Sequence, residues 1–324
     1  MQVYARASVP SCLYSSTMII TLGTTPTVQR TMVFDRVTLD QVNRAKHVHD
    51  HASGKAINAA RVIRVLGDDV LALGFQGGDT GAFCSRDLDS LGIPHAFIDV
   101  SSPTRTCTTI VDLATRQTTE LVEETAPVEA AHTDAIFSLL KQHIASARVL
   151  VLSGTLAPGV PDDFYARCVS LARQHAVATI VDAKGEALKL AIAEHPTWIK
   201  PNKDEVEVTV GHPIKTEQDL LVAIKELAAA GANHIVVTRG ADHVLFYDGS
   251  QTKLLTIPQV EAINPIGSGD AVAGGIAFGW ANRKSSSECV NIGIACGVAN
   301  AMTPYSGHVT LEGVAEVMAR LGGD

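Results

Sequence analysis

Short apolar segments alternate with amphipathic ones through most of the chain, and this alternation constrains the fold more than any other feature. Beyond Pro127 the apolar segments predict strands at 149–153, 179–182, 198–200 and 234–238. The amphipathic segments predict helices at 130–145, 162–175, 186–194, 204–210 and 217–230. Strands that alternate with helices form a mostly parallel sheet with helices on both faces. We therefore expect an α/β fold with a large core, for which 46% hydrophobic residues are ample.

The N-terminal third of the chain contains extended segments that have no helices of their own. Residues within about 29–50 and 104–123, including an extended stretch predicted at Val42–Val48, fit a small β-sheet that projects as a lid. We expect one domain over 18–324. Residues 1–17 have no continuous apolar core, so they predict a disordered extension rather than a signal peptide.

Charge and cysteine content exclude several classes of protein. A net charge of −8 argues against a nucleic-acid partner, although a few focused cations would still bind a small anion. No apolar run reaches the roughly 18 residues that a membrane helix needs. The six cysteines contain no C-x-x-C pair, which favours buried reduced thiols in a cytoplasmic protein.

A glycine-rich turn, Gly267-Ser268-Gly269-Asp270, follows an extended segment predicted at Leu254–Ile263 and precedes a helix of small residues. Such a turn lets a ligand approach the backbone, and the N–H groups at the helix start attract an anion. Asp270 is a carboxylate beside this anion site. It is either a helix cap, because Asp is favoured there, or a catalytic base.

Four further stretches place charged or polar residues after predicted strands or at helix starts. They are Ser53-Gly54-Lys55-Ala56-Ile57-Asn58, Thr104-Arg105-Thr106, Pro201-Asn202-Lys203-Asp204-Glu205 and Val237-Thr238-Arg239-Gly240. Ligands of open α/β sheets bind at the carboxyl ends of the strands, so one site would unite these stretches. Taken alone, Lys55 at its helix start favours an anion site over a solvated cation, whereas an isolated Arg105 is better explained as a solvated cation. Glu205 is equally well explained as an acid in a first helical turn.

In this order, the stretches resemble the motifs of ribokinase-like (PfkB) carbohydrate kinases, and most of all the branch of 1-phosphofructokinases and tagatose-6-phosphate kinases. The resemblance implies a ribokinase-like fold with a small β-sheet lid, and ATP and Mg²⁺ as cofactors. It implies that Asp270 is the base that deprotonates a sugar hydroxyl. The amides of Gly267, Ser268 and Gly269 would hold the transferring phosphoryl group.

The same resemblance implies roles for residues on either side of the turn. Those implied at the sugar are Gln29, Gly54, Lys55, Asn58 and Arg105, with Lys55 and Arg105 on a phosphate that the sugar already carries. Those implied at the nucleotide are Thr238, Gly240 and Asn300, and Glu205 would act through water on the magnesium.

Two departures from the branch pattern concern the sugar. Gln29 stands where the branch has an acid that binds sugar hydroxyls, so it brings no charge. Ser53 and Ala56 replace two glycines around Lys55. The identity of the sugar is therefore left open.

Three histidines, His47, His49 and His51, alternate along a predicted strand and so share one face. A metal site and an exposed face of the lid are the two interpretations. We favour the exposed face, because no acid or cysteine pattern accompanies the histidines.

The sequence thus predicts ATP- and Mg²⁺-dependent phosphorylation of a hydroxyl on a sugar phosphate, of the fructose 1-phosphate, fructose 6-phosphate or tagatose 6-phosphate type. Two alternatives stay open: a kinase of a neutral sugar or nucleoside, and a sugar-phosphate or nucleotide sensor without turnover. Open edges of the lid sheet would favour a homodimer formed through the lid.

Overall fold

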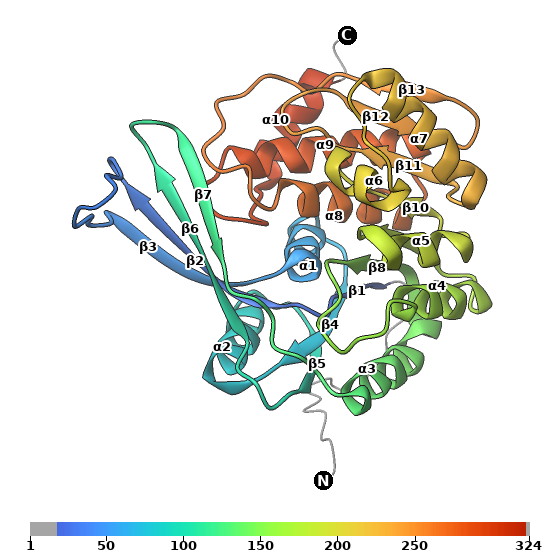
Figure 1. Ribbon diagram of the computed structural model, residues 1–324, viewed down its shortest axis with the longest axis horizontal. Coiled ribbons are helices and arrows are strands. Elements are labelled where there is room, and N and C mark those ends of the chain that lie inside the picture. The colour runs from blue at the N-terminus through green and yellow to red at the C-terminus, as the bar shows by residue number, and fades with distance from the viewer. Residues whose placement is uncertain (1–17, 322–324) are drawn as a thin grey trace.

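The protein is organised around one large sheet. The computed structural model describes residues 18–321, and nine strands within that range form this sheet (Figure 1). In order across the sheet they are β13 (Thr252–Leu255), β12 (Val244–Tyr247), β11 (His234–Val237), β10 (Trp198–Ile199), β9 (Ala178–Asp182), β8 (Ala147–Ser153), β1 (Met18–Leu22), β4 (Val70–Gln76) and β5 (His95–Asp99). Neighbours from β11 to β5 run parallel, whereas β12 and β13 form an antiparallel edge. The predicted mostly parallel α/β sheet is confirmed.

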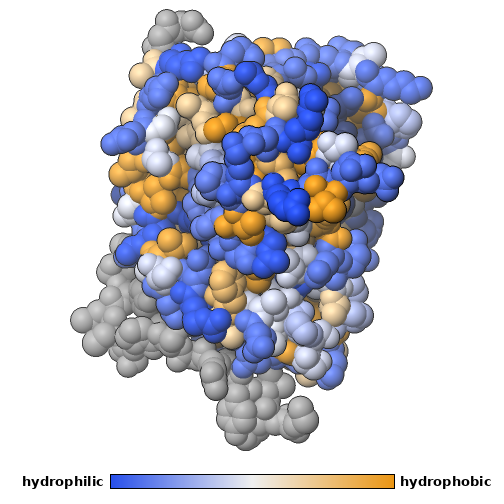
Figure 2. All heavy atoms as spheres, turned by 90° about the vertical axis from the view of Figure 1, so that its left-hand side faces the viewer, coloured by the Kyte–Doolittle hydropathy of each residue, from blue (hydrophilic) through white to orange (hydrophobic). Residues whose placement is uncertain are grey.

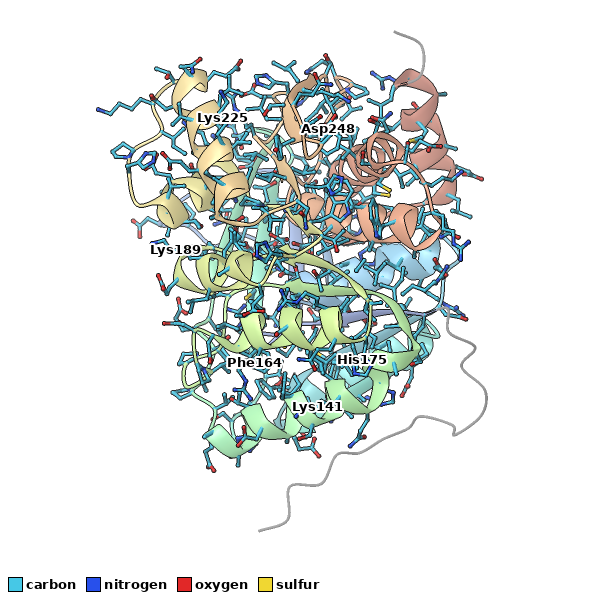
Figure 3. The ribbon with its side chains drawn as sticks, turned by 90° about the vertical axis from the view of Figure 1, so that its right-hand side faces the viewer. Lys141, Phe164, His175, Lys189, Lys225 and Asp248 are labelled. Carbon is cyan, nitrogen blue, oxygen red and sulfur yellow. The ribbon has the colours of Figure 1, made fainter. Side chains whose placement is uncertain are left out.

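Helices cover both faces of this sheet. One face packs against α3 (Ala130–His143), α4 (Phe164–Gln174), α5 (Gly185–Ala193), α6 (Lys203–Val210) and α7 (Glu217–Ala230). The other face packs against α1 (Lys55–Val65), α2 (Gly78–Ser90), α8 (Ser268–Ala281), α9 (Ser286–Ala301) and α10 (Leu311–Leu321). Figure 3 looks onto the side formed by α3, α4, α5 and α7, where Lys141, Lys189 and Lys225 are exposed.

The sequence of β8 shows why its strand is buried on both sides. Val149, Leu150, Val151 and Leu152 are all 0% exposed. Successive side chains of a strand point to opposite faces, so Leu150 and Leu152 join the core under α3 and α4, and Val149 and Val151 join the core under α1 and α8. A continuous apolar run is what a central parallel strand requires.

Four further strands form a second sheet, which we call the lid sheet. In order they are β3 (His47–Ser53), β2 (Thr27–Phe34), β6 (Arg105–Asp112) and β7 (Gln117–Val122). The central pair β2 and β6 is parallel, and the two outer pairs are antiparallel. The lid sheet projects away from the helices of the main body (Figure 1).

The two faces of the lid sheet differ in character. The register aligns Gln29 with His51 and Cys107, so these side chains share one face, which we call the cleft face. Met32, Val48, Ile110 and Leu121 lie on the opposite, outer face. Figure 2 looks onto this side of the molecule, where hydrophobic side chains form small groups between hydrophilic ones.

Two predicted strands have the wrong bounds, and a third strand was not predicted. The strand predicted at Val42–Val48 begins only at His47 and continues to Ser53, because pairing with β2 sets its register. The strand predicted at Leu254–Ile263 ends at Leu255, and the segment after it lines a cavity instead. The strand that was not predicted is β5, a short strand of mixed composition at the sheet edge.

Two other expectations concern ends and cysteines. The prediction for residues 1–17 lies outside the described residues, as does Cys12. The five cysteines within 18–321 are buried and free. In that same range no helix is long and apolar enough to cross a membrane.

Candidate active site

A left-handed glycine precedes α8. Gly267 has φ +83°, and a Cβ at this position would lie 2.6 Å from the backbone nitrogen of Gly307. Only glycine accepts both constraints without strain. The helix starts at Ser268, so the N–H groups of its first turn have no partners within the helix and carry the positive end of its dipole. Asp270 lies in this first turn and is 8% exposed.

The turn borders a cavity of about 430 Å³, which is in the size range of small-molecule sites. One part of its lining is polar and comprises Lys55, Asp182, Lys200, Asn202, Glu205, Thr238, Ser268 and Asp270. The other part is largely apolar and comprises Val244, Ile257, Pro258, Val260, Ala262, Pro265, Val272, Ile294, Val298 and Ala301. Such a lining suits a ligand with a charged end and a flat apolar end.

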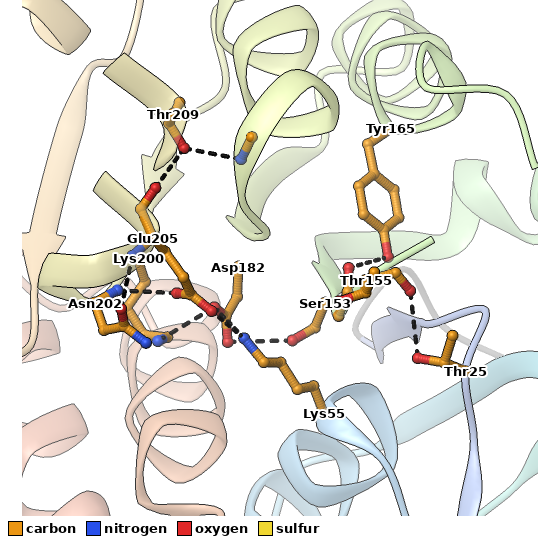
Figure 4. Close-up of polar contacts among 12 residues, drawn as sticks. Thr25, Lys55, Ser153, Thr155, Tyr165, Asp182, Lys200, Asn202, Glu205 and Thr209 are labelled. Carbon is orange, nitrogen blue, oxygen red and sulfur yellow. Dashed lines mark hydrogen bonds and ion pairs between the residues drawn. The ribbon is translucent and has the colours of Figure 1, made fainter. Parts of the chain in front are cut away.

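Two lysines share one buried carboxylate in the polar part (Figure 4). Asp182 is the last residue of β9 and is 0% exposed, and its Oδ1 lies 3.2 Å from Lys55 Nζ and 3.3 Å from Lys200 Nζ. Lys55 Nζ also lies 2.9 Å from Glu205 Oε1. Burial alone would raise the pKa of Asp182, but Lys200 and Lys55 hold it below its ordinary value. The cavity therefore contains two cations within reach of an anionic ligand.

Asp270 is poised to accept a proton. Burial raises the pKa of its carboxyl to about 6, although Lys55, the hydrogen bond from Asn58 and Lys200 favour the charged form. The side-chain amide of Asn58, on α1, donates to Asp270 Oδ2 at 2.8 Å. A base with a pKa near the working pH is effective, because it is mostly deprotonated yet still binds a proton.

Glu205 is both a helix cap and a cavity residue. The Asn202 side chain accepts from Glu205 N at 2.8 Å, while Glu205 Oε2 accepts from Asn202 N at 2.9 Å, which forms a capping box at the start of α6. Its other oxygen faces Lys55. Residues 18–321 contain no group of three His, Cys, Asp or Glu that could hold a metal. Mg²⁺ keeps several waters and needs only one or two carboxylates, so a single water-bridged Glu205 fits it.

Arg105 and Gln29 lie apart from this cavity. Arg105 lines a small recess with Thr24, Gln76 and Thr125, where its Nη1 donates to Glu123 O at 3.0 Å. Its Nε is buried and has no partner among the described residues. Gln29 is 2% exposed and donates through Nε2 to Thr109 Oγ1 at 2.7 Å. The recess thus holds a cation with an unused donor.

The predicted nucleotide residues fall into two positions. Thr238 and Gly240 line the cavity directly after β11. Asn300 is 0% exposed, and its amide donates to Ile266 O at 3.0 Å and to Ser268 Oγ at 3.1 Å. Asn300 therefore holds the glycine turn in place through hydrogen bonds to residues on either side of Gly267.

A model of pfkB family carbohydrate kinases matches residues 16–310, which is most of the chain. The chain belongs to this family. Two tagatose-6-phosphate kinases of Staphylococcus epidermidis are 30% and 31% identical to it over 307 residues, and each match covers 94% of this chain and 98% of the relative.

Solved structures agree with this assignment. Phosphofructokinase-2 from Escherichia coli in complex with fructose-6-phosphate is 25% identical, with a TM-score of 0.85 over 94% of this chain and 99% of that chain. Ribokinase of Arabidopsis thaliana complexed with ribose and ATP is 16% identical, with a TM-score of 0.70 over 93% of this chain and 98% of that chain, and it supports the fold alone. The predicted ribokinase-like fold is confirmed.

Two site residues of this pfkB-family kinase, Asp182 and Lys200, were not predicted from the sequence. Both lie at the carboxyl ends of predicted strands, 179–182 and 198–200, which is where ligands of open α/β sheets bind. A charged residue that ends an otherwise apolar strand was the available signal.

The histidines differ from the prediction. His47 is exposed and His49 half-buried, but His51 is 1% exposed, so the prediction of an exposed face is wrong for His51. His51 lies against Ser306 and Tyr305 in the loop after α9.

Proposed function

We propose that this pfkB-family chain transfers the γ-phosphoryl group of ATP to a hydroxyl of a sugar phosphate. One observation carries the proposal: the buried Asp270 carboxylate and the glycine turn face the same cavity as Lys55 and Lys200. Kinases of this family use ATP. The names of the relatives, tagatose-6-phosphate kinase and phosphofructokinase-2, support a phosphorylated acceptor of the fructose 1-phosphate, fructose 6-phosphate or tagatose 6-phosphate type.

In the proposed reaction Asp270 takes the proton of the acceptor hydroxyl as the hydroxyl oxygen attacks the γ-phosphorus of ATP. The bond from this phosphorus to the β-phosphate oxygen breaks, and ADP leaves. The amides of Gly267, Ser268 and Gly269 stabilise the charge on the phosphoryl oxygens. Lys200 Nζ lies 3.4 Å from where a Cβ of Gly269 would stand, so it can reach the same oxygens. Mg²⁺, bridged by water to Glu205, would supply further positive charge when bound.

Each end of the substrates has proposed ligands. The nucleotide lies along Thr238, Gly240 and the apolar lining, with Asn300 holding the turn. The sugar contacts Gln29, Gly54 and Asn58. We place Arg105 at the phosphate that the sugar already carries, because its guanidinium lines the recess and can bind a phosphate with two N–H groups. We place Lys55 at the transferring phosphoryl group instead of at the phosphate of the sugar. Its Nζ lies among the carboxylates around Asp270.

The lid sheet closes over the sugar and excludes water, which competes as phosphoryl acceptor. Its outer face exposes Val48 and Leu121, which supports pairing with a second copy. Free buried cysteines support a reducing, cytoplasmic setting.

The test is an ADP-release screen with fructose 1-phosphate, fructose 6-phosphate, tagatose 6-phosphate, ribose and adenosine. Turnover on one or more of the three phosphates and none on ribose or adenosine supports the proposal. Turnover only on a neutral acceptor would replace it with a sugar or nucleoside kinase. ATP binding without turnover on any acceptor would indicate a sensor.

A further inference from the structure

Asn58 is held in one orientation by groups on both sides of its amide. Its Nδ2 donates to Asp270 Oδ2 at 2.8 Å. Its Oδ1 accepts from Ser53 Oγ at 2.9 Å and from Arg61 Nη1 at 3.4 Å. A carboxylate only accepts and a guanidinium only donates, so the reverse orientation of the amide would face two repulsive partners.

This orientation fixes the direction of a longer chain of hydrogen bonds. The Ser53 hydroxyl has one proton and donates it to Asn58 Oδ1. Its oxygen must therefore accept from Ser306 Oγ, 3.3 Å away. Ser306 in turn must accept from His51 Nε2, 3.2 Å away. Each group therefore donates toward Asp270, and the chain runs from His51 through Ser306, Ser53 and Asn58 to the carboxylate.

The state of His51 agrees with this direction. Burial, followed by Arg61, His308 and His49, lowers the pKa of His51 to about 2, so the ring is neutral. Its Nδ1 is buried without a partner among the described residues. A proton on Nε2 leaves only a lone pair unused at Nδ1, whereas the other tautomer would bury an unused N–H.

Close packing holds the groups of this hydrogen-bond chain together. A Cβ at Gly307, whose φ is +67°, would lie 2.7 Å from the Asn58 side chain. A Cβ at Gly267 would lie 2.9 Å from the Cβ of Ser306. The glycine turn, the loop after α9 and Asn58 therefore touch one another directly.

We propose that Ser53, Ser306 and His51 are positioning residues, which act by fixing Asn58 against Asp270. This inference rests on the proposed function, in which Asp270 is the base. Ser53 and His51 belong to β3 of the lid sheet, so the lid strand itself sets the geometry at the reacting carboxylate. It also gives a physical role to Ser53, one of the residues by which this chain departs from its branch.

The expected signature is a change at Asp270 itself. Lys55, Lys200 and Asp182 face this carboxylate from the body, and Asn58 is its neutral donor. A loosened Asn58 stabilises the charged form less, so Ser53→Ala should raise the Asp270 pKa by about 0.5 to 1 and lower kcat about twofold to tenfold. The matched control is Thr31→Val, which removes a buried hydroxyl without a partner from the same sheet.

The pKa is measured by carbon-13 NMR of the Asp270 carboxyl in the ligand-free protein, beside the pH profile of kcat. Nitrogen-15 NMR of His51 should show a neutral ring protonated at Nε2. His51→Gln, which keeps a donor, should retain more activity than His51→Leu.

A Ser53→Ala protein that is folded, with an unchanged Asp270 pKa and kcat, would overturn the inference. Absence of turnover in the wild type would instead overturn the proposed function, while the NMR titration still reports on the chain of hydrogen bonds.

Discussion

The strands of the large sheet and of the lid sheet differ in how their two faces are covered. Strands such as β8 are buried on both faces and fixed between helices. Strands of the lid sheet carry polar residues on the cleft face and exposed apolar residues on the outer face. The body therefore supplies the rigid part of the site, with Asp270, Lys200 and the glycine turn. In the proposed function the lid contributes Gln29 and Arg105 to the sugar site, beside Asn58 of α1.

Packing explains this division. In the body, α8 and α9 approach so closely that a Cβ at Gly275 would lie 2.8 Å from the Cα of Gly293. The tip of the lid contacts the body through polar pairs such as Arg116 with Glu261, both 72% exposed. Exposed pairs contribute at most about 1 kcal/mol. We infer that body residues carry out the chemical step and that Gln29 and Arg105 of the lid act on acceptor binding, whereas β3 acts on the chemical step only through Asn58.

Asp270→Asn should have the largest effect. Loss of a general base costs roughly 10²–10⁴-fold in kcat, with the KM values little changed. Steady-state kinetics test this, and a decrease below about tenfold would show that the body does not supply the base.

The same variant should be more stable than the wild type at neutral pH. The pKa of Asp270 is raised to about 6, so its folded-state protonation favours folding at low pH and that gain is lost as pH rises through 6. A neutral Asn avoids this loss. Denaturant unfolding at pH 7 should give a higher free energy of unfolding for the variant.

Lys55→Ala and Arg105→Ala should distinguish the kinetic role of the body from that of the lid. Each removes a charge-assisted contact worth about 1.5–3 kcal/mol, or about 10- to 150-fold. Lys55→Ala should lower kcat and raise the KM of ATP, whereas Arg105→Ala should raise only the KM of the sugar phosphate. Arg105→Lys should recover part of the loss, because it lacks the bidentate fork. Should both variants raise only the sugar-phosphate KM, Lys55 belongs at the acceptor end.

The pH profile of the wild type sharpens the comparison further. With an Asp270 pKa of about 6, kcat at pH 5 should be about tenfold below its value at pH 7, because the base must be deprotonated. His51 of the lid sheet and His308 in the loop after α9 have pKa values lowered to about 2 and about 4, so they add no step in this range. The contrary result is a step in the pH profile of kcat, centred near pH 6.5, that persists in Asp270→Glu but disappears when His51 is replaced. Such a result would show that a lid histidine, and not Asp270, sets the pH dependence.

Leu121→Asp should have the smallest effect on rate and the clearest effect on assembly. The side chain is 54% exposed on the outer face of the lid sheet, so the substitution costs little stability. Gel filtration with light scattering should show a smaller species than the wild type, with kcat within about twofold because the catalytic groups lie in the body. An unchanged molecular mass would argue against pairing through this face.

The sequence predicted the fold because strand and helix periodicities are local signals. It also predicted the glycine-rich start of α8, since Gly267 and Asp270 are only three residues apart, although the helix already begins at Ser268. Asp182 and Lys200 were missed because their pairing depends on the order of strands in the sheet. The burial of His51 depends on a loop about 255 residues away, which no periodicity reports. The segment after β13 was misassigned because its apolar residues face a cavity rather than a neighbouring strand.

The cysteines provide an unplanned reporter of motion. Cys107 is 2% exposed in the lid sheet, whereas Cys168 and Cys296 are 0% exposed in the body. Opening of the lid, as the proposed function requires, would uncover the Cys107 thiol and leave the other two protected until the chain unfolds. The rate of alkylation at Cys107, with Cys168 as internal standard, would therefore measure how often the lid opens, without any added label.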